Sequence, residues 1–548
     1  MISSLLAAHK RLSVNERLVF LVAATIFILA FITSLGYWYF SVSSIIPAQG
    51  GEYTEGLVGQ PSFINPVLSN ANEIDHALMV LMFADLETLA ESIEHSEDGK
   101  EWTLVLRDNL VWSDGETLDI NDVLFTIDTI KNREANSPLF STWRDVDVKI
   151  VDERTLTFKL PAIYSYFGDT LADFRPIPQH AFGSIPPSNL RISEFSLEPI
   201  ASGPYRFLSI EKERDGLIAE YKLVRNNNYA GERALIGRFN VRFFQTFKEA
   251  LAAFNRHYLD GIGGLRNEHV ASISRQAEVY TFNVPRYYAL FVNQSANAAL
   301  AELEVRKAMD LAIDRKSLIN SALEGQGEIA DGPILPFLDG YLKPEDNKQS
   351  LREAKKVLGD AGWETNKDTG LREKDGEVLD FDLIVPNIDF LVESAQILQK
   401  QVKEIGVNFS PIVLEPEDVN EEIIKTRNYQ ILLFGNVLRE NSDIYSFWHS
   451  NQRFYPGLNL SLYSNPEVDE ALGVSRTVFD QEERAAALNL IQSKIRSGLP
   501  AIFLYSPNYI YASRPETKGI EGTLLPSPAD HLEEAAAWYF ETTRSFKS

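Results

Sequence analysis

Apolar positions along residues 101–130 recur first at every second residue and then at the spacing of a helix. The first pattern predicts a β-strand with one buried face, and the second predicts an α-helix that buries one stripe. A turn sequence at 113–115 separates the two elements, and Asp119 is the predicted N-cap of the helix. The alternating positions are Trp102, Leu104 and Leu106, and the helical positions are Val123, Ile127 and Ile130. Taken alone, these elements fit any α/β protein, and none of the residues has a catalytic pattern.

The N-terminal region has a long apolar run, with no charged residue between Arg17 and Glu52. A helix over 18–40 would span roughly 34 Å, which is enough to cross a hydrocarbon core of about 30 Å. Three Lys and Arg residues precede the run, and the next one follows only at Lys100. The positive-inside bias therefore places residues 1–17 in the cytoplasm. We predict a single-pass cell-membrane protein whose body lies on the extracytoplasmic face.

A cleaved secretory signal is the alternative interpretation of this run. The small residues at 41–43, or Ala48, loosely fit a cleavage site. The apolar run is, however, longer than the roughly 15 residues at the upper limit for a signal peptide. The aromatic residues at 37–39 also suit the outer membrane interface. An uncleaved anchor is thus favoured, and residues 41–51 are predicted to be a short tether.

Composition limits the classes of protein that fit. With 548 residues and 45% hydrophobic content, the chain can bury large cores in two or three domains. A net charge of −25 opposes contact with nucleic-acid phosphates, so we predict no nucleic-acid partner. The absence of cysteine excludes disulfides, thiolate metal sites, a cysteine nucleophile and a lipid-modified N-terminal cysteine.

Motifs of catalysis are also missing from the sequence. The eight histidines form no HExxH pair, and there is no GxSxG elbow or Walker A loop. The glycines at 261–264 lack the Lys-Ser/Thr pair that a phosphate-binding loop needs. Carboxylates paired in space, among 77 Asp and Glu residues, are the remaining route to a hydrolase. We therefore predict a protein that is not an enzyme and has no cofactor and no metal held by its own side chains, with a hydrolase as the less favoured alternative.

Three segments carry a resemblance to a known family. VWSDGETLDINDVLFT at 111–126 is similar to a signature of the peptide/nickel family of extracellular solute-binding proteins, the receptors that feed ABC importers. VRKAMDLAIDR at 305–315 resembles a second signature, and its pattern predicts a helix followed by another helix capped by Asp314. The similarity continues through AKKVLGDAGW at 354–363. The chain is identified as a membrane-anchored member of this family, similar to oligopeptide- and dipeptide-binding proteins.

The resemblance implies an α/β, two-lobed, periplasmic-binding-protein-like fold (type II, cluster C) with an inserted subdomain, plus one N-terminal transmembrane helix. Strand and helix patterns that alternate from 379 to 505 support a second α/β lobe. The predicted division is 52–85, 203–292 and 505–548 for lobe I, 86–202 for the inserted subdomain, and 293–504 for lobe II.

The resemblance also implies a function and its partners. The expected protein is a monomer that captures an oligopeptide in the cleft between its lobes by hinge closure. It would then deliver the ligand to the permease and ATPase subunits of an ABC importer. A sugar or a metal chelate stays open as the ligand. A peptide sensor or chaperone, without transport, is the alternative use of the same fold.

The segment 432–451 resembles the cleft loop of the family, with its DPD-type turn. Here the turn at 441–443 reads Asn-Ser-Asp. Peptide-binding relatives have an acidic residue just upstream that can hold the amino group of the peptide. This chain has Asn-Val-Leu-Arg at 436–439, which puts a free-amine peptide in question, although Glu440 could substitute. The candidate ligand-binding residues are Phe434, Gly435, Asn436, Arg439, Asn441, Asp443 and Trp448, with Pro386 and Asn387 from a neighbouring strand end.

Overall fold

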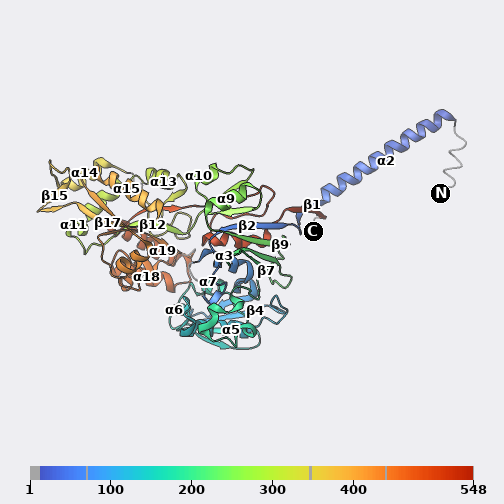
Figure 1. Cartoon of the computed structure of the whole chain (residues 1–548), viewed down its shortest axis with the longest axis horizontal. Helices are drawn as coiled ribbons and strands as arrows, with labels where there is room; N and C mark the ends of the chain where they lie inside the picture. Colours follow the sequence, from blue (N-terminus) through green and yellow to red (C-terminus); the bar gives the residue numbers. More distant parts are fainter. Residues whose placement is uncertain (1–12, 69–71, 345–348, 439–440, 547–548) are drawn as a thin grey trace.

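The computed structural model describes residues 13–68, 72–344, 349–438 and 441–546. One long helix, α2 (Val14–Val42), projects away from a two-lobed body (Figure 1). No residue of α2 is buried against the body. Within the described chain, it is the one helix long and apolar enough to cross a membrane. The helix contains the whole predicted span, 18–40, and the membrane around it stays a prediction.

Lobe I is built on a seven-stranded mixed sheet with the order β11-β21-β10-β2-β9-β8-β7. The central strand β2 runs parallel to both of its neighbours, whereas β7, β8 and β9 form an antiparallel meander at one edge. The strands are β2 (Glu52–Val58), β7 (Tyr205–Lys212), β8 (Ile218–Arg225), β9 (Arg238–Phe244), β10 (Gly261–Gly263), β11 (Glu278–Phe282) and β21 (Tyr509–Ser513). The helices α3 (Glu73–Met82) and α9 (Phe247–Asn255) pack against this sheet.

A four-stranded antiparallel sheet, with the order β3-β4-β6-β5, is inserted between β2 and β7. Its core is continuous with that of lobe I. Helix α5 (Ile120–Lys131) follows Asp119, whose side chain accepts a hydrogen bond from the N–H of Asn121, so the predicted cap is confirmed. The six apolar residues predicted to face inward in this strand and helix are all buried. The other elements here are β3 (Ala90–His95), β4 (Glu101–Leu106), β5 (Asp147–Ile150), β6 (Thr155–Lys159), α4 (Leu86–Leu89), α6 (Phe140–Trp143), α7 (Phe167–Ala172) and α8 (Gln179–Phe182).

Lobe II is built on a six-stranded sheet with the order β13-β20-β12-β19-β17-β18. Both faces of this sheet are buried, because alternate residues of β12 belong to two different cores: Leu290 and Val292 to one, and Ala289 and Phe291 to the other. The strands are β12 (Arg286–Val292), β13 (Gly327–Ile329), β17 (Asp380–Pro386), β18 (Asn408–Leu414), β19 (Ile431–Val437) and β20 (Ala501–Pro507). The longer helices are α12 (Leu303–Ala312), α13 (Arg315–Ala322), α14 (Leu351–Asp360), α15 (Asp389–Lys403), α18 (Pro466–Thr477) and α19 (Gln481–Gly498). The side chain of Asp314 caps α13, as predicted.

The chain crosses between the two lobes at residues 283–285 and at Asn508. The predicted boundaries after residue 292 and before residue 505 are therefore wrong, because they place β12 and the end of β20 in lobe I. Strand β12 pairs with β19 on one side and with β20 on the other, deep in the sheet of lobe II. An apolar strand has the same sequence pattern in either sheet, so only the pairing assigns it. The other boundaries remain our proposed division of the chain.

The predicted tether at 41–51 contains a strand. Strand β1 (Ser43–Ala48) pairs antiparallel along its whole length with β22 (Glu541–Phe546). The N–H of Gly50, which follows this strand, donates to the carbonyl of Leu235 in lobe I at 3.0 Å. The predicted short tether is therefore partly held in a strand pair, since small residues confer flexibility only where the backbone groups have no partners.

The glycines at 261–264 lie in and beside β10, between β2 and β21. At this place the hydroxyl of Tyr511 donates to the buried carboxylate of Glu55 at 2.6 Å. A Cβ atom at Gly261 would collide with the hydroxyls of Tyr511 and Tyr53. Gly261 therefore makes room for a buried tyrosine pair. This packing accounts for the glycine without a phosphate-binding role.

Candidate ligand-binding site

A cavity of about 980 Å³ lies where lobe I, the inserted region and lobe II meet. Lobe I contributes α3 and the 3-10 helix η7 (Pro528–Ala537). The inserted region contributes α7 and the residues that follow it, and lobe II contributes the first turns of α19 and the loop after β19. The volume is at the upper end of the roughly 300–1,000 Å³ that ligand pockets occupy. Both lobes thus wall one space large enough for a small solute.

The wall of this cavity is acidic. Among the described residues that line it, six are Asp or Glu, two are Arg and one is His. Walls of low dielectric constant focus the field of such charges into the space between them. The acidic residues are Glu87, Asp169, Asp173, Asp339, Asp530 and Glu533. This arrangement favours a ligand that carries positive charge.

Two of these carboxylates stand side by side on η7 of lobe I. His76 Nε2 lies 2.6 Å from Asp530 Oδ1. Arg175 Nη2, from the inserted region, donates to Glu533 Oε1 at 2.7 Å. The Glu533 side chain keeps 42% of its surface open, yet the surrounding protein raises the pKa of its carboxyl through desolvation, which the charge of Arg175 only partly offsets. Among the described residues Glu533 therefore has one hydrogen-bond partner, Arg175, and its exposed surface leaves room for another from the cavity.

Polar contacts join lobe II to the inserted region along one side of the cavity. Asn441 Nδ2 donates to Asp169 Oδ2 at 2.8 Å. The hydroxyl of Tyr164 donates to Asp443 Oδ2 at 3.0 Å. The same carboxylate forms an ion pair with Arg476 on α18, with Nε and Oδ2 3.2 Å apart. Asn441 and Asp443, two of the residues predicted from the sequence, are thus brought together at the contact between the two parts.

Arg476 also stacks between two tyrosines. Its Cζ lies 4.7 Å from the ring centroid of Tyr164 and 4.4 Å from that of Tyr445. Desolvation, followed by the charge of Asp443, raises the pKa of Tyr164 to about 12. The hydroxyl is therefore protonated at neutral pH and serves as a hydrogen-bond donor. These contacts hold Tyr164 of the inserted region against α17 and α18 of lobe II.

The other candidate residues lie elsewhere. Asn436 is buried and donates to the hydroxyl of Tyr287 at 2.8 Å. The backbone of Gly435 on β19 lies against the ring of Tyr288, where a Cβ would come within 2.8 Å of it. Trp448 is fully buried in a core of lobe II, against which Phe434 packs. Phe434, Gly435, Asn436 and Trp448 thus pack within lobe II. Side chains of these types fit a protein core as well as they fit a binding cleft.

Pro386, Asn387 and Arg439 complete the set of candidates. Pro386 is buried at the end of β17, and Asn387 is exposed and donates to Glu415 Oε1 at 2.7 Å. Arg439 lies outside the described residues. Among the described candidates, Asn441 is the one that lines the cavity.

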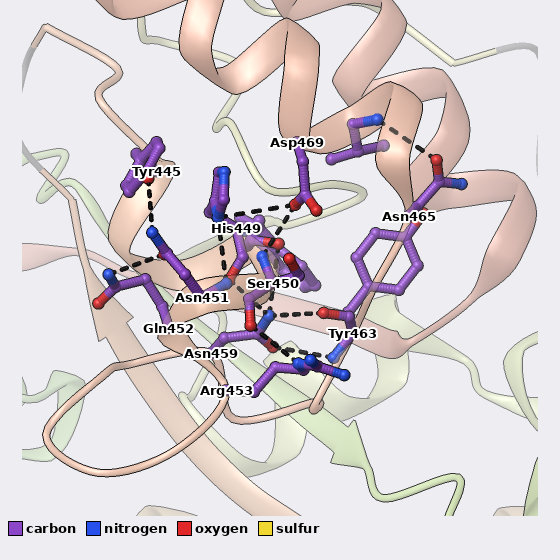
Figure 2. A network of polar contacts seen from close by, with 12 residues as sticks. Tyr445, His449, Ser450, Asn451, Gln452, Arg453, Asn459, Tyr463, Asn465 and Asp469 are labelled. Atoms are coloured by element: carbon purple, nitrogen blue, oxygen red, sulfur yellow. Dashed lines mark hydrogen bonds and ion pairs between the residues drawn. The ribbon is translucent and has the colours of Figure 1, made fainter.

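The segment after the predicted cleft turn is held by its own polar network. Helix α17 (Tyr445–Trp448) is followed by a loop in which buried Asn459 donates to the carbonyls of His449 and Tyr463 at 3.2 and 2.9 Å (Figure 2). Asp469 of α18 accepts from the N–H of Ser450 at 2.8 Å. The network fixes the position of α17 and of Tyr445, the residue that stacks on Arg476.

Most of the cavity wall was not predicted from the sequence. His76, Arg175, Arg484, Asp530 and Glu533 line the cavity but belong to no motif, and each is an ordinary surface residue type. His76 and Asp530 stand 454 residues apart in the chain. No local spacing pattern could have joined them. Within the described residues, no group of three or more His, Cys, Asp or Glu side chains is arranged to hold a metal ion.

Comparisons with known proteins place this geometry in a family. The sequence profile of the bacterial extracellular solute-binding proteins, family 5 Middle, matches residues 87–454. The oligopeptide-binding protein AppA of Bacillus subtilis is 25% identical over 481 residues, covering 84% of this chain and 87% of AppA. The nickel-binding periplasmic protein of Escherichia coli is 27% identical over 454 residues, covering 79% of this chain and 83% of that protein.

Solved structures share the fold. The substrate-binding protein CtaP of Listeria monocytogenes superposes with a TM-score of 0.77 at 24% identity, covering 90% of this chain and 99% of CtaP. NikZ of Campylobacter jejuni, solved with Ni(L-His), gives a TM-score of 0.71 at 24% identity and covers 89% of this chain and 99% of NikZ. At these identities the structural likeness establishes the two-lobed architecture alone.

Proposed function

The chain belongs to the bacterial extracellular solute-binding proteins of family 5, and we propose that it captures an oligopeptide between its lobes and delivers it to the permease of an ABC importer. Members of this family bind peptides or nickel for import, and the relatives named above are binding proteins rather than enzymes. The ligand and the delivery are our proposal. We infer a body that acts as a monomer on the extracytoplasmic face.

The observation that carries this proposal is the cavity of about 980 Å³ walled by both lobes and the inserted region. A ligand that contacts all three parts stabilises the conformation in which they lie close together. The two chain crossings, at 283–285 and at Asn508, are short enough to act as the hinge. Closing on the ligand would then produce the surface that a permease recognises.

The charge of the cavity bears on the class of peptide. The loop at 436–438 has no carboxylate to hold a peptide amine. The acidic wall of lobe I offers Asp530 and Glu533 for the same purpose. An ammonium group, either at the peptide terminus or on a lysine side chain, finds its strongest partner there. We therefore propose a peptide with a net positive charge and a free amine.

The test is to identify what the purified protein holds. The full chain is extracted in detergent, and its ligands are released by mild denaturation and identified by mass spectrometry. The expected result is a mixture of short peptides enriched in Lys and Arg. A single sugar or a nickel chelate would overturn the ligand class.

A binding measurement completes this test. We expect a synthetic pentapeptide with two lysines to bind at least fivefold more tightly, by calorimetry, than the same pentapeptide with two glutamates. The matched control repeats the pair at high salt, where the difference should shrink because the charges are screened. A preparation with neither released peptides nor calorimetric binding of either probe contradicts the proposed receptor function.

A further inference from the structure

Strand β22 ends beside the outer end of α2. In the antiparallel register of the pair, Ser43 lies opposite Phe546 and Ala48 lies opposite Glu541. Because Ser43 directly follows α2, β22 returns to the end of the helix from which the body begins (Figure 1). The helix is thus joined to the body by two strands and not by one.

Side chains of β22 contact the aromatic end of α2. The ring centroid of Phe546 lies 6.1 Å from that of Trp38 and 5.9 Å from that of Tyr39. Arg544 Cζ lies 4.4 Å from the ring centroid of Phe40. Aromatic rings and a cation therefore gather where an apolar helix ends, which is the composition found at membrane–water interfaces.

The base of the strand pair is packed into lobe I. The ring of Phe540, which precedes β22, stacks on Tyr53 with centroids 6.1 Å apart. Arg514 Cζ lies 3.6 Å from the centroid of the same ring. A Cβ at Gly51 would collide with this ring. The absence of a side chain at that position lets the chain leave the body close to Phe540, so the strand pair continues the packing of the body.

The strand pair and the adjoining end of α2 leave apolar side chains exposed. Ile45 is 62% exposed, Phe546 61% and Trp38 55%. An isolated pair of strands is marginally stable in water. The interface of a lipid bilayer accepts apolar side chains and would cover these residues. If α2 crosses a membrane, that interface lies at its end.

We propose that residues 43–48 and 541–546 form a membrane seat that contacts phospholipid headgroups. The rings of Phe546 and Trp38 lie in the outer interface, and the Arg544 guanidinium faces the lipid phosphates. The seat requires that α2 remains attached, and it does not depend on which ligand the cavity binds. Its consequence is that the body is held at one height and orientation above the membrane, so the cavity is presented to a membrane partner in one way.

The pairing is tested first by cross-linking the full chain in vesicles. The chain has no cysteine, so introduced thiols are the only ones present. Ser44 and Ser545 are register partners, and we expect the Ser44→Cys, Ser545→Cys pair to form a disulfide in most molecules under mild oxidation. The off-register control, Ser44→Cys with Thr542→Cys, should cross-link at least fivefold less. Equal cross-linking of the two pairs, or none in the first, overturns the seat.

Contact with lipid is tested by a fluorophore. Ser545→Cys is labelled with an environment-sensitive dye in vesicles of phosphatidylcholine and phosphatidylglycerol that carry a quencher just below the headgroups. We expect at least threefold stronger quenching than for the same dye at Ser188→Cys, an exposed position in the inserted region. Equal quenching at both positions, with the disulfide formed, leaves a strand pair that does not touch the membrane and overturns the seat.

The role of the ring is tested by substitution. Phe546→Ser should lower the quenching at residue 545 at least twofold while the 44–545 disulfide still forms, because the backbone pairing is kept. The control is Ile192→Ser, which removes an apolar side chain that is 82% exposed on the inserted region. It should leave quenching unchanged. A loss of quenching in the control and not in Phe546→Ser contradicts the proposal.

Discussion

Asp122 and Glu533 are both carboxylates held by hydrogen bonds, but they differ in how much hydrogen-bonding capacity remains for a ligand. Asp122 Oδ2 accepts from Trp112 Nε1 and from the N–H of Asp119, each at 3.0 Å. Its Oδ1 accepts from the N–H of Gln179 at 2.7 Å, and the residue is 4% exposed. Such a saturated, buried carboxylate has nothing to offer a ligand, and its effect is to hold the turn at 112–122 against the inserted region.

Glu533 has a different environment. It accepts from Arg175, and 42% of its side-chain surface is open. The same contrast separates the family signature from the cavity wall as regions. Asp122 of the signature uses its hydrogen bonds on other parts of the fold, whereas Glu533 of the cavity wall has exposed surface left to bind a ligand. A motif that identifies a family therefore need not contain the residues that bind its ligand, and substitutions in the two regions should have different consequences.

The largest effect is expected from Trp112→Ala. Trp112 is fully buried, so the substitution should lower the free energy of unfolding by about 3–5 kcal/mol through lost burial and a cavity. Urea unfolding followed by circular dichroism measures it. The control is Asp114→Ala in the same turn, which removes a partly exposed contact with His180 and should cost less than about 1 kcal/mol. A Trp112→Ala protein that keeps its stability but has lost ligand binding would contradict the assignment of the signature to the fold and of the cavity wall to the ligand.

Asp122→Asn should have the next largest effect. The shape is kept, but an amide NH₂ replaces one acceptor oxygen and leaves at least one of the three donors, Trp112 Nε1 or a backbone N–H, unsatisfied in a buried site. We expect a loss of about 1–3 kcal/mol in the free energy of unfolding. Affinity of the folded protein for a cationic peptide should be unchanged in calorimetry. Unaltered stability would show that Asp122 is not a scaffold residue.

Glu533→Gln should separate binding from stability. The substitution removes a negative charge from the cavity wall and should weaken binding of a lysine-containing peptide about fivefold to tenfold, with screening by water and salt limiting the effect. The unfolding midpoint should move little. Glu534→Gln is the matched control. The side chain of Glu534 is exposed, and it is not among the described residues that line the cavity. Equal losses in the two variants would assign the effect to long-range charge.

The pH dependence of binding should report the same carboxylate. Desolvation raises the pKa of Glu533 above its ordinary value of 4.5, so as the pH falls the group becomes protonated at a higher pH than an ordinary glutamate. Affinity for a cationic peptide should therefore decrease on acidification, and the loss should begin at a higher pH than it would for an ordinary glutamate. Calorimetry on the wild type and on Glu533→Gln tests this, because the variant should show a flatter profile in that range.

The smallest effect is expected from Tyr164→Phe. It removes the hydrogen bond to Asp443 that joins the inserted region to lobe II, which is worth about 0.5–1.5 kcal/mol. If closure favours binding, affinity should decrease about twofold to fivefold. The control is Tyr445→Phe, which removes a hydroxyl whose partner, Asn451, lies in lobe II itself. A larger loss in the control would place the important contact within lobe II.

Local features of the chain were predictable because their causes are local. The caps Asp119 and Asp314 act on N–H groups two or three residues away, and the apolar faces of α5 and α12 follow from helical spacing. The family was predictable for the same reason, since its signatures are short strings. The candidate site was predictable only in part: Asn441 lines the cavity, and Asp443 lies at the contact beside it.

The sequence by itself determined the strand β4, the helices α5, α12 and α13, the apolar span at the N-terminus and the membership of the family, because each depends on neighbours along the chain. Only the tertiary structure decided that β12 belongs to lobe II, that β1 pairs with β22, and that Asp530 meets His76 across 454 residues. Strand pairing and cavity walls depend on which surfaces meet after the chain has folded. Periodicity is the same for a strand in either sheet, and a single acidic residue is the same letter on a solvated surface and on the wall of a cavity.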